Sequence, residues 1–298
     1  MTNVRIQGRV EDLSPRAVPA FIGWLQPILS AAVGSSWQLN LDGGDHGYFG
    51  PTAAVVVASS LLLAKTQRQQ ATVTLPQAPP ALAAFCMFSG LTFIAQHGEL
   101  AAPPATDPPE SETAPLQQFR KMNWGGSTPL VRLIRRHLPG LGSDSEDLLR
   151  TCYSEIVQNI EDHSQSPIGG VICARYFTNL HEIRIAVADR GIGIGESLRQ
   201  SKTATRMRIR DDSHALELVL QGGVTSKSRA NNMGQGISNL AAIASGNGGR
   251  LMILSGNAHA VVDSENTHIH SSAKSAFPGT LVLLSLRVST GDPEPDDE

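Results

Sequence analysis

Residues 182–195 read EIRIAVADRGIGIG, and this stretch decides the fold of the second half of the chain. Its IRIAVA core is a short apolar run, which predicts a buried strand. Asp189 ends the run, and Gly191, Gly193 and Gly195 follow at alternate positions. Glycines after a strand let a ligand approach the backbone closely, and a buried carboxylate can accept a hydrogen bond from an exocyclic amine. The stretch suggests a nucleotide site in which Asp189 reads the base, although an ordinary β-turn uses the same residue types.

Two common phosphate-binding patterns are missing from the sequence. A dinucleotide fingerprint counted from Gly191 or Gly193 would need a glycine where Glu196 or Leu198 stands. A Walker-type G-x-x-x-x-G-K-[ST] motif occurs nowhere in the chain. The glycine-rich turn therefore points to another class of nucleotide-binding fold.

A long helix is predicted upstream of this turn. Ser143 and Glu146 form an S-x-x-E capping box, after which apolar residues recur at every fourth position. Glu155, Asn159 and His163 follow one face of this helix, one turn apart. A carboxylate, an amide and an imidazole beside an apolar stripe suit a ligand site, but a solvated helix edge would look the same.

Further glycines follow the turn. Residues 222–227 read GGVTSK, and Gly234 and Gly236 lead into an apolar segment with helical spacing. Backbone N–H groups at a helix N-terminus bind phosphate, and Lys227 would add positive charge. Thr280 opens the last apolar strand. Taken singly, these features are also typical of a flexible loop and a plain turn.

In this order the motifs resemble those of the GHKL ATPases. They run E-x-x-x-N, D-x-G-x-G, a glycine-rich segment, G-x-G before a helix, and G-T before a strand. That superfamily shares the Bergerat ATP-binding fold, an α/β sandwich in which helices cover one face of a mixed sheet. The resemblance covers residues 119–288. It implies an α+β chain that binds ATP and Mg²⁺.

The resemblance also implies a role for each site residue. Glu155 would be the catalytic base, Asn159 the Mg²⁺ ligand and Asp189 the residue that reads adenine. Gly191 and Gly193 would make room for the purine. Residues 196–233 would form the lid over ATP, including a basic run at 199–210 that either is solvated or contacts phosphate or an acidic partner. The other ATP-binding residues implied are Lys227, Gly234, Gly236 and Thr280.

The subfamily that the sequence resembles best is the compact anti-sigma-factor serine/threonine kinases, in which Ser-Glu precedes the helix asparagine as Ser154 and Glu155 do here. The expected function is a Mg²⁺-dependent ATPase or protein serine/threonine kinase of a partner-switching system. The alternative is a nucleotide-gated interaction module with little turnover. Expected partners are proteins, among them a STAS or sigma-factor-like protein.

Residues 1–100 predict a small α/β domain. Strand patterns at 37–41 and 71–75 alternate with helix patterns at 53–64 and 80–96, which implies at least one parallel strand pair. This order resembles a STAS (anti-anti-sigma) domain. Pro51 stands where such domains carry a phosphorylated serine, and proline has no hydroxyl, so only Thr52 could take phosphate there.

Composition sets the remaining expectations. The stretch AAPPATDPPESETAP predicts a stiff linker over 101–118, which leaves residues 119–288 as the ATPase domain and 289–298 as an acidic tail. Docking across such a linker between two copies would give a homodimer.

A net charge of −3 gives no footprint for nucleic acid, and three cysteines give no disulfide framework. Apolar stretches too short to span a membrane complete the expectation of a cytoplasmic protein without membrane contact.

Overall fold

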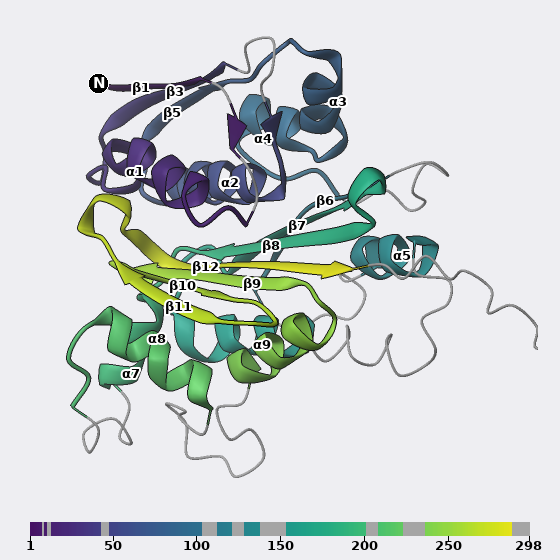
Figure 1. Cartoon of the computed structure of the whole chain (residues 1–298). Coiled ribbons are helices and arrows are strands. Elements are labelled where there is room, and N and C mark those ends of the chain that lie inside the picture. The colour runs from purple at the N-terminus through teal and green to yellow at the C-terminus, as the bar shows by residue number, and fades with distance from the viewer. Residues whose placement is uncertain are drawn as a thin grey trace, which may run out of the picture.

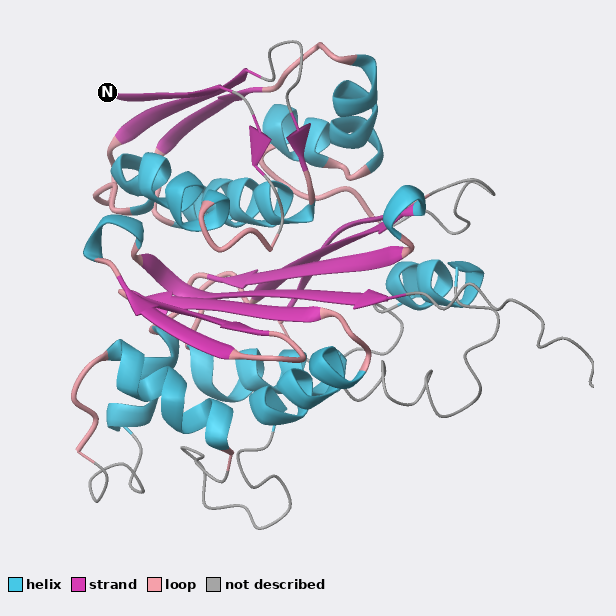
Figure 2. Ribbon diagram, viewed as in Figure 1, coloured by secondary structure: helices cyan, strands magenta, loops and turns pink. Residues whose placement is uncertain are grey.

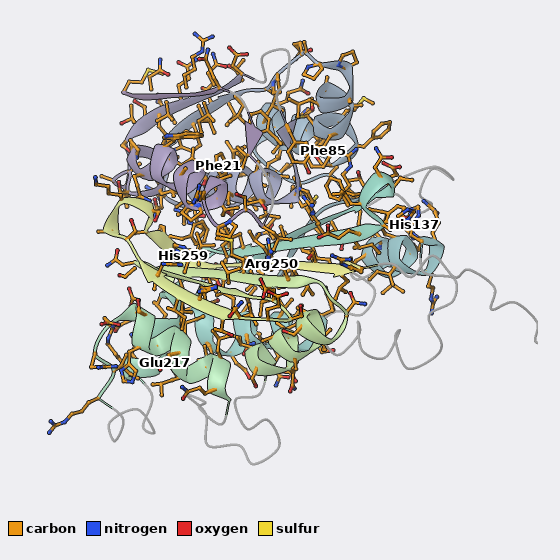
Figure 3. All side chains as sticks on the ribbon, viewed as in Figure 1. Phe21, Phe85, His137, Glu217, Arg250 and His259 are labelled. Carbon is orange, nitrogen blue, oxygen red and sulfur yellow. The ribbon has the colours of Figure 1, made fainter. Side chains whose placement is uncertain are left out.

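The computed structural model describes residues 1–7, 9–10, 13–42, 48–102, 112–120, 128–137, 153–200, 208–222 and 236–287. These residues form a mixed α+β structure with a small parallel sheet and a large antiparallel sheet. Figure 1 shows four layers, in the order small sheet, helices, large sheet, helices. Figure 3 labels one residue in each of the last three, namely Phe21, His259 and Glu217.

The small sheet is entirely parallel, as the sequence predicts. Its strand order is β1 (Thr2–Gln7), β3 (Ser36–Asp42) and β5 (Gln70–Thr74). Alternate residues of β3 are buried, which directs its apolar side chains toward the helices and its polar ones outward. A short parallel pair, β2 (Arg9–Val10) and β4 (Tyr48–Phe49), lies beside it.

Two helices form the layer between the sheets. They are α1 (Ala17–Leu29) and α2 (Pro51–Thr66), and Figure 2 shows both lying between the two sets of strands. Helix α2 is buried almost all round because it has a sheet on either side. The single helix expected over 80–96 is in fact two, α3 (Pro80–Phe88) and α4 (Leu91–His97), because Gly90 adopts a left-handed φ of 80° between them.

The large sheet has seven strands, and every neighbouring pair is antiparallel. The expectation of a mixed sheet is therefore wrong. Short turns at 178–181, 257 and 263–266 join three of these antiparallel pairs directly, whereas the longer connections 120–169 and 190–249 contain helices. The strand order is β11 (Thr267–Ser271), β10 (Ala258–Val262), β9 (Arg250–Gly256), β12 (Phe277–Arg287), β8 (Glu182–Asp189), β7 (Gly170–Phe177) and β6 (Thr113–Phe119).

Helices cover both faces of this sheet, whereas the sequence predicted one covered face. In β8, Ile183, Ile185 and Val187 face one core, and Ala186 and Ala188 face the other. The first core lies under the C-terminal helices, and the second lies under α1 and α2. The C-terminal helices are residues 153–159, α7 (Gly193–Gln200), α8 (Asp212–Gln221) and α9 (Gly236–Gly246), with α5 (Thr128–His137) beside β6 and β7.

The end of the predicted linker is a strand. Residues 113–119 form β6, which pairs with β7 at one edge of the large sheet, and its run of buried residues explains why it is not a linker. The proline-rich residues 103–111 lie outside the described residues, as does the predicted acidic tail.

Within the part of the chain that the structure describes, no single helix is long and apolar enough to cross a membrane. By length and composition alone, α3 and α4 together pass the same test, but a bend of 68° separates them.

Candidate functional site

A pocket of about 810 Å³, part of it open to solvent, lies between the large sheet and its C-terminal helices. Most of its wall is aliphatic and comes from several elements, including Ile156, Val187, Leu240 and Val282. A few polar groups interrupt this wall, among them Asn159, His163, Asp189 and Thr280. Such a lining suits a flat ligand that buries apolar faces and makes hydrogen bonds at its edge.

Asp189 is the buried carboxylate of this pocket. It is the last residue of β8, and it is 1% exposed. Its Oδ1 atom accepts a hydrogen bond from the backbone N–H of Gly191 at 2.8 Å, and Thr280 donates to the carboxylate through both its backbone N–H and its hydroxyl. These bonds fix the carboxylate in one orientation at the end of the strand.

Opposing effects set the pKa of the Asp189 carboxyl. Burial raises the pKa of its carboxyl to about 6, although the hydrogen bonds from Gly191 and Thr280 and the charge of Arg190 oppose the rise. The folded protein therefore keeps an expensive buried carboxylate whose charge it only partly compensates. Perturbed pKa values of this kind concentrate in functional sites.

The two predicted glycines after Asp189 have different surroundings. A side chain at Gly191 would overlap the carbonyl oxygen of Ser164, which also accepts a hydrogen bond from Ile192 N at 2.8 Å. Gly193 lines the pocket with a left-handed φ of 73°, and a Cβ there would stand 2.8 Å from Ser255 Oγ. Gly191 thus packs the turn against the preceding helix, and only Gly193 borders the pocket.

Three other predicted residues meet at a second place beside the pocket. Glu155 and Asn159 lie one turn apart on the helix of residues 153–159, which continues into a π-helical turn at Ile160–Ser164. Gly236 begins α9 directly against them, because a Cβ on it would lie 2.6 Å from Glu155 Oε2 and 2.9 Å from Asn159 Nδ2. Glu155 is half-buried, and burial raises its pKa.

This arrangement fits Mg²⁺ only with help from a ligand. Among the described residues, no group of three or more His, Cys, Asp or Glu could hold a metal ion. Mg²⁺ usually takes one or two protein oxygens and completes its shell with phosphate oxygens and water. The side chains of Asn159 and Glu155 supply that number of oxygen donors next to the helix terminus at Gly236.

Serines that the sequence did not single out hold the site together. Ser255 Oγ is buried, accepts from Ile194 N at 2.8 Å and donates to Gly279 O at 3.1 Å, which ties the turn after Asp189 to the start of β12. Ser166 Oγ accepts from the backbone N–H of Arg190 at 3.2 Å. Serine is so common in loops that its spacing gave no signal for these roles.

Two predicted residues and part of the predicted lid lie outside the described residues. These are Lys227, Gly234 and the segments 201–207 and 223–235. In the described part of the 196–233 region, Arg199 of the basic run pairs with Glu196 at 3.5 Å and with Asp212 at 3.2 Å.

Comparison with models of known protein families finds no match, and neither does comparison with curated proteins.

Proposed function

We propose that this chain is a GHKL-type protein with a Bergerat-fold C-terminal half, which binds ATP and Mg²⁺ and acts as an ATPase or a protein serine/threonine kinase. The proposal rests chiefly on one observation. One mostly aliphatic pocket is lined by two pairs of residues. Asp189 and Thr280 are joined by hydrogen bonds, and Asn159 and Gly236 lie in contact.

In this proposal Asp189 reads the base. A carboxylate oxygen accepts a hydrogen bond from the exocyclic amine of adenine, and the aliphatic wall packs on both faces of the purine. The hydroxyl of Thr280 stays at the edge of the base, where it already donates to Asp189. Guanine carries a carbonyl in place of this amine, so the same carboxylate would repel it.

The phosphates would lie at the other end of the pocket. The first turn of α9 presents backbone N–H groups there, and the positive end of the helix dipole favours an anion. Asn159 would bind Mg²⁺ through its amide oxygen. When bound, Mg²⁺ neutralises charge on the phosphate oxygens during phosphoryl transfer.

Glu155 is placed to act as the base. Its carboxylate is half-buried beside Gly236, and its raised pKa makes it a better proton acceptor than an exposed glutamate. It would orient the attacking water or hydroxyl group and take its proton at a carboxylate oxygen. Whether the acceptor is water or a protein side chain separates an ATPase from a kinase.

For the N-terminal half we propose a STAS-like role without the usual phosphorylation switch. Pro51 begins α2, and Thr52 beside it is 1% exposed, so a kinase cannot reach its hydroxyl in the folded chain. Helix α2 packs on β7 and β8 of the same chain. Docking within one copy does not require the homodimer that the sequence led us to expect, which stays a prediction, as do the protein partners.

The packing of α2 on β8 also favours the second candidate, a nucleotide-gated interaction module. The strand that carries Asp189 is the one that α2 covers, so a nucleotide bound on one face can affect the layer on the other. Turnover separates the candidates, because a pure module binds ATP without steady release or transfer of phosphate.

The test is calorimetric titration of the full chain with ATP and Mg²⁺. Asp189→Asn replaces an acceptor oxygen with a donor, and a lost hydrogen bond of about 1–3 kcal/mol predicts affinity lower by roughly 5- to 150-fold. Asp263→Asn is the matched control, because Asp263 accepts its hydrogen bonds in a turn away from the pocket lining. Equal ATP affinity in both folded variants would overturn the assignment of Asp189.

A further inference from the structure

Consecutive residues at the end of β8 serve two different layers. Asp189 lines the pocket under the C-terminal helices. The side chain of Arg190 points the other way, into the layer of α1 and α2, as the alternation of a strand requires. A single peptide unit thus joins the proposed adenine site to the N-terminal layer.

The guanidinium of Arg190 is fixed inside that layer. Its side chain donates from Nη1 to Ser60 Oγ of α2 at 2.9 Å and from Nη2 to the carbonyl of Leu29, the last residue of α1, at 3.3 Å. The guanidinium also lies 5.6 Å from the ring centroid of Phe277. Arg190 is only 6% exposed, and its Nε has no hydrogen-bond partner within the described residues.

Burial of the Arg190 guanidinium between two layers costs desolvation free energy. Burial lowers the pKa of the Arg190 guanidinium to about 10, in spite of the nearby Asp189 carboxylate. Replacement of buried ion pairs by apolar residues of similar volume is often neutral or stabilising, so a buried charge is weak evidence for a stabilising role. Packing alone therefore does not account for this residue, whereas a use for its positive charge does.

We infer that Arg190 is a positioning residue for nucleotide binding: its guanidinium, held by α1 and α2, anchors the end of β8 that carries Asp189, and its positive charge favours the ionised carboxylate from the opposite face of the sheet. This inference rests on the proposed function, because it concerns the same pocket. It gives the N-terminal layer a direct part in nucleotide affinity, and it does so without any contact between that layer and the nucleotide.

The charged surroundings of Asp189 favour this reading. Glu155 and His163 face the pocket region from the helix side, and Glu196 and Arg199 of α7 are exposed. Among the described residues, Arg190 is the one whose charge acts on the pKa of Asp189, and it lowers that pKa in addition to the larger effects of the hydrogen bonds from Gly191 and Thr280.

The first experiment compares the full chain with Arg190→Met and Arg190→Lys. We titrate Mg²⁺–ATP into each protein between pH 5 and 8 and follow the Asp189 carboxyl by ¹³C NMR. Removal of the charge in Arg190→Met should move both the midpoint of ATP binding and the titration of Asp189 to higher pH. Arg190→Lys keeps the charge and should restore the wild-type midpoints. A merely structural role would weaken binding at every pH without moving them.

Two neighbouring serines of α2 allow a matched test of the hydrogen bond between Arg190 and Ser60. Ser60 Oγ accepts from Arg190 and donates to the carbonyl of Val56, whereas Ser59, also buried in α2, donates to the same carbonyl only. Ser60→Ala should lower ATP affinity at pH 7 by about 3- to 10-fold, which is the effect of one typical hydrogen bond. Ser59→Ala should leave it unchanged. This pair decides the matter if Arg190→Met does not fold.

The outcomes separate the two proposals. Unmoved midpoints in folded Arg190→Met, or equal affinities in the two serine variants, would overturn the role of Arg190. If the wild-type chain binds no ATP at any pH, the proposed function fails instead. The NMR titration of Asp189 then still tests Arg190, because it needs no nucleotide.

Discussion

Glu155 and Gly236 lie in direct contact, with the carboxylate of the first filling the space that a side chain on the second would need. The contact joins the helix of residues 153–159 to the N-terminus of α9, where the proposed phosphate site lies. Asn159 borders the same spot. The absence of a side chain at position 236 is therefore a condition for the geometry of both polar residues.

Gly236→Ala should disturb this geometry. Its Cβ would come within 2.6 Å of Glu155 Oε2 and 2.9 Å of Asn159 Nδ2, so at least one of these side chains must move. We expect turnover to fall by at least about tenfold, since small displacements of catalytic groups have large effects on rate. Gly246→Ala at the other end of α9 is the control, because nothing lies within 4 Å of the added methyl group. Steady-state kinetics with Mg²⁺–ATP distinguish the two, and equal rates would refute the contact as a functional constraint.

Glu155→Gln should separate binding from chemistry. The amide keeps the size of the side chain but cannot take a proton, so ATP affinity should persist while phosphate release or transfer falls by about 10²–10⁴-fold. Glu217→Gln makes the same change at an exposed site on α8, which Figure 3 labels in the outer helix layer, and it should have no effect. Full activity in Glu155→Gln would mean that another residue is the base.

The stability of the fold should fall as pH rises through the titration of Asp189. Its carboxyl has a pKa of about 6 in the folded protein, above the ordinary value of 3.8, so the folded state holds this proton more tightly. Below about pH 4 the group is protonated in both states and contributes nothing. Above about pH 6 it is ionised in both, at a cost to the folded state of about 3 kcal/mol. Urea unfolding of the nucleotide-free wild type and Asp189→Asn from pH 4 to 7 measures this slope as the difference between the two proteins. A pH-independent difference would contradict the raised pKa.

Helix α2 should tolerate no charge at its buried positions. Val56 is fully buried in the core that α2 shares with both sheets, and Val56→Asp would place an uncompensated carboxylate there. We expect a loss of several kcal/mol, enough to unfold the N-terminal layer and the large sheet together. Lys65→Ala on the same helix removes an exposed side chain and should cost less than about 1 kcal/mol. Circular dichroism melts of the two variants provide the comparison.

The sequence predicted best the elements whose signals are local. The strand before Asp189 is a continuous apolar run that ends in a carboxylate and glycines, and it forms β8 as expected. The strands β3, β5 and β12 and the helices α2 and α9 also occur where the pattern indicated them. The family resemblance implied that Asp189 and Thr280 both belong to the ATP site, but their hydrogen bonds to one another were not predicted, because residues so far apart in the chain share no local pattern.

The elements that were missed depend on distant partners. Strand β6 contains Pro115 and two glutamines and becomes a strand only because β7 offers it an edge. The strand β11 is short and mostly exposed, so its sequence, THIHS, carries little hydrophobic signal. The apolar sequence of α2 is consistent with its burial on all sides. That sequence does not indicate, however, that a second sheet covers the other side of the helix, because residues much later in the chain form that sheet.

The place of α2 between two sheets has a consequence for synthesis. The helix ends at Thr66, whereas β8, on which it packs, ends at Asp189. At about 5–20 residues per second, the ribosome needs on the order of 10 s to make the intervening chain. During that interval the small sheet can shield only one side of the helix, and its other apolar side faces water. We therefore expect the nascent chain to bind chaperones that recognise exposed aliphatic segments, and a product truncated before β8 to aggregate.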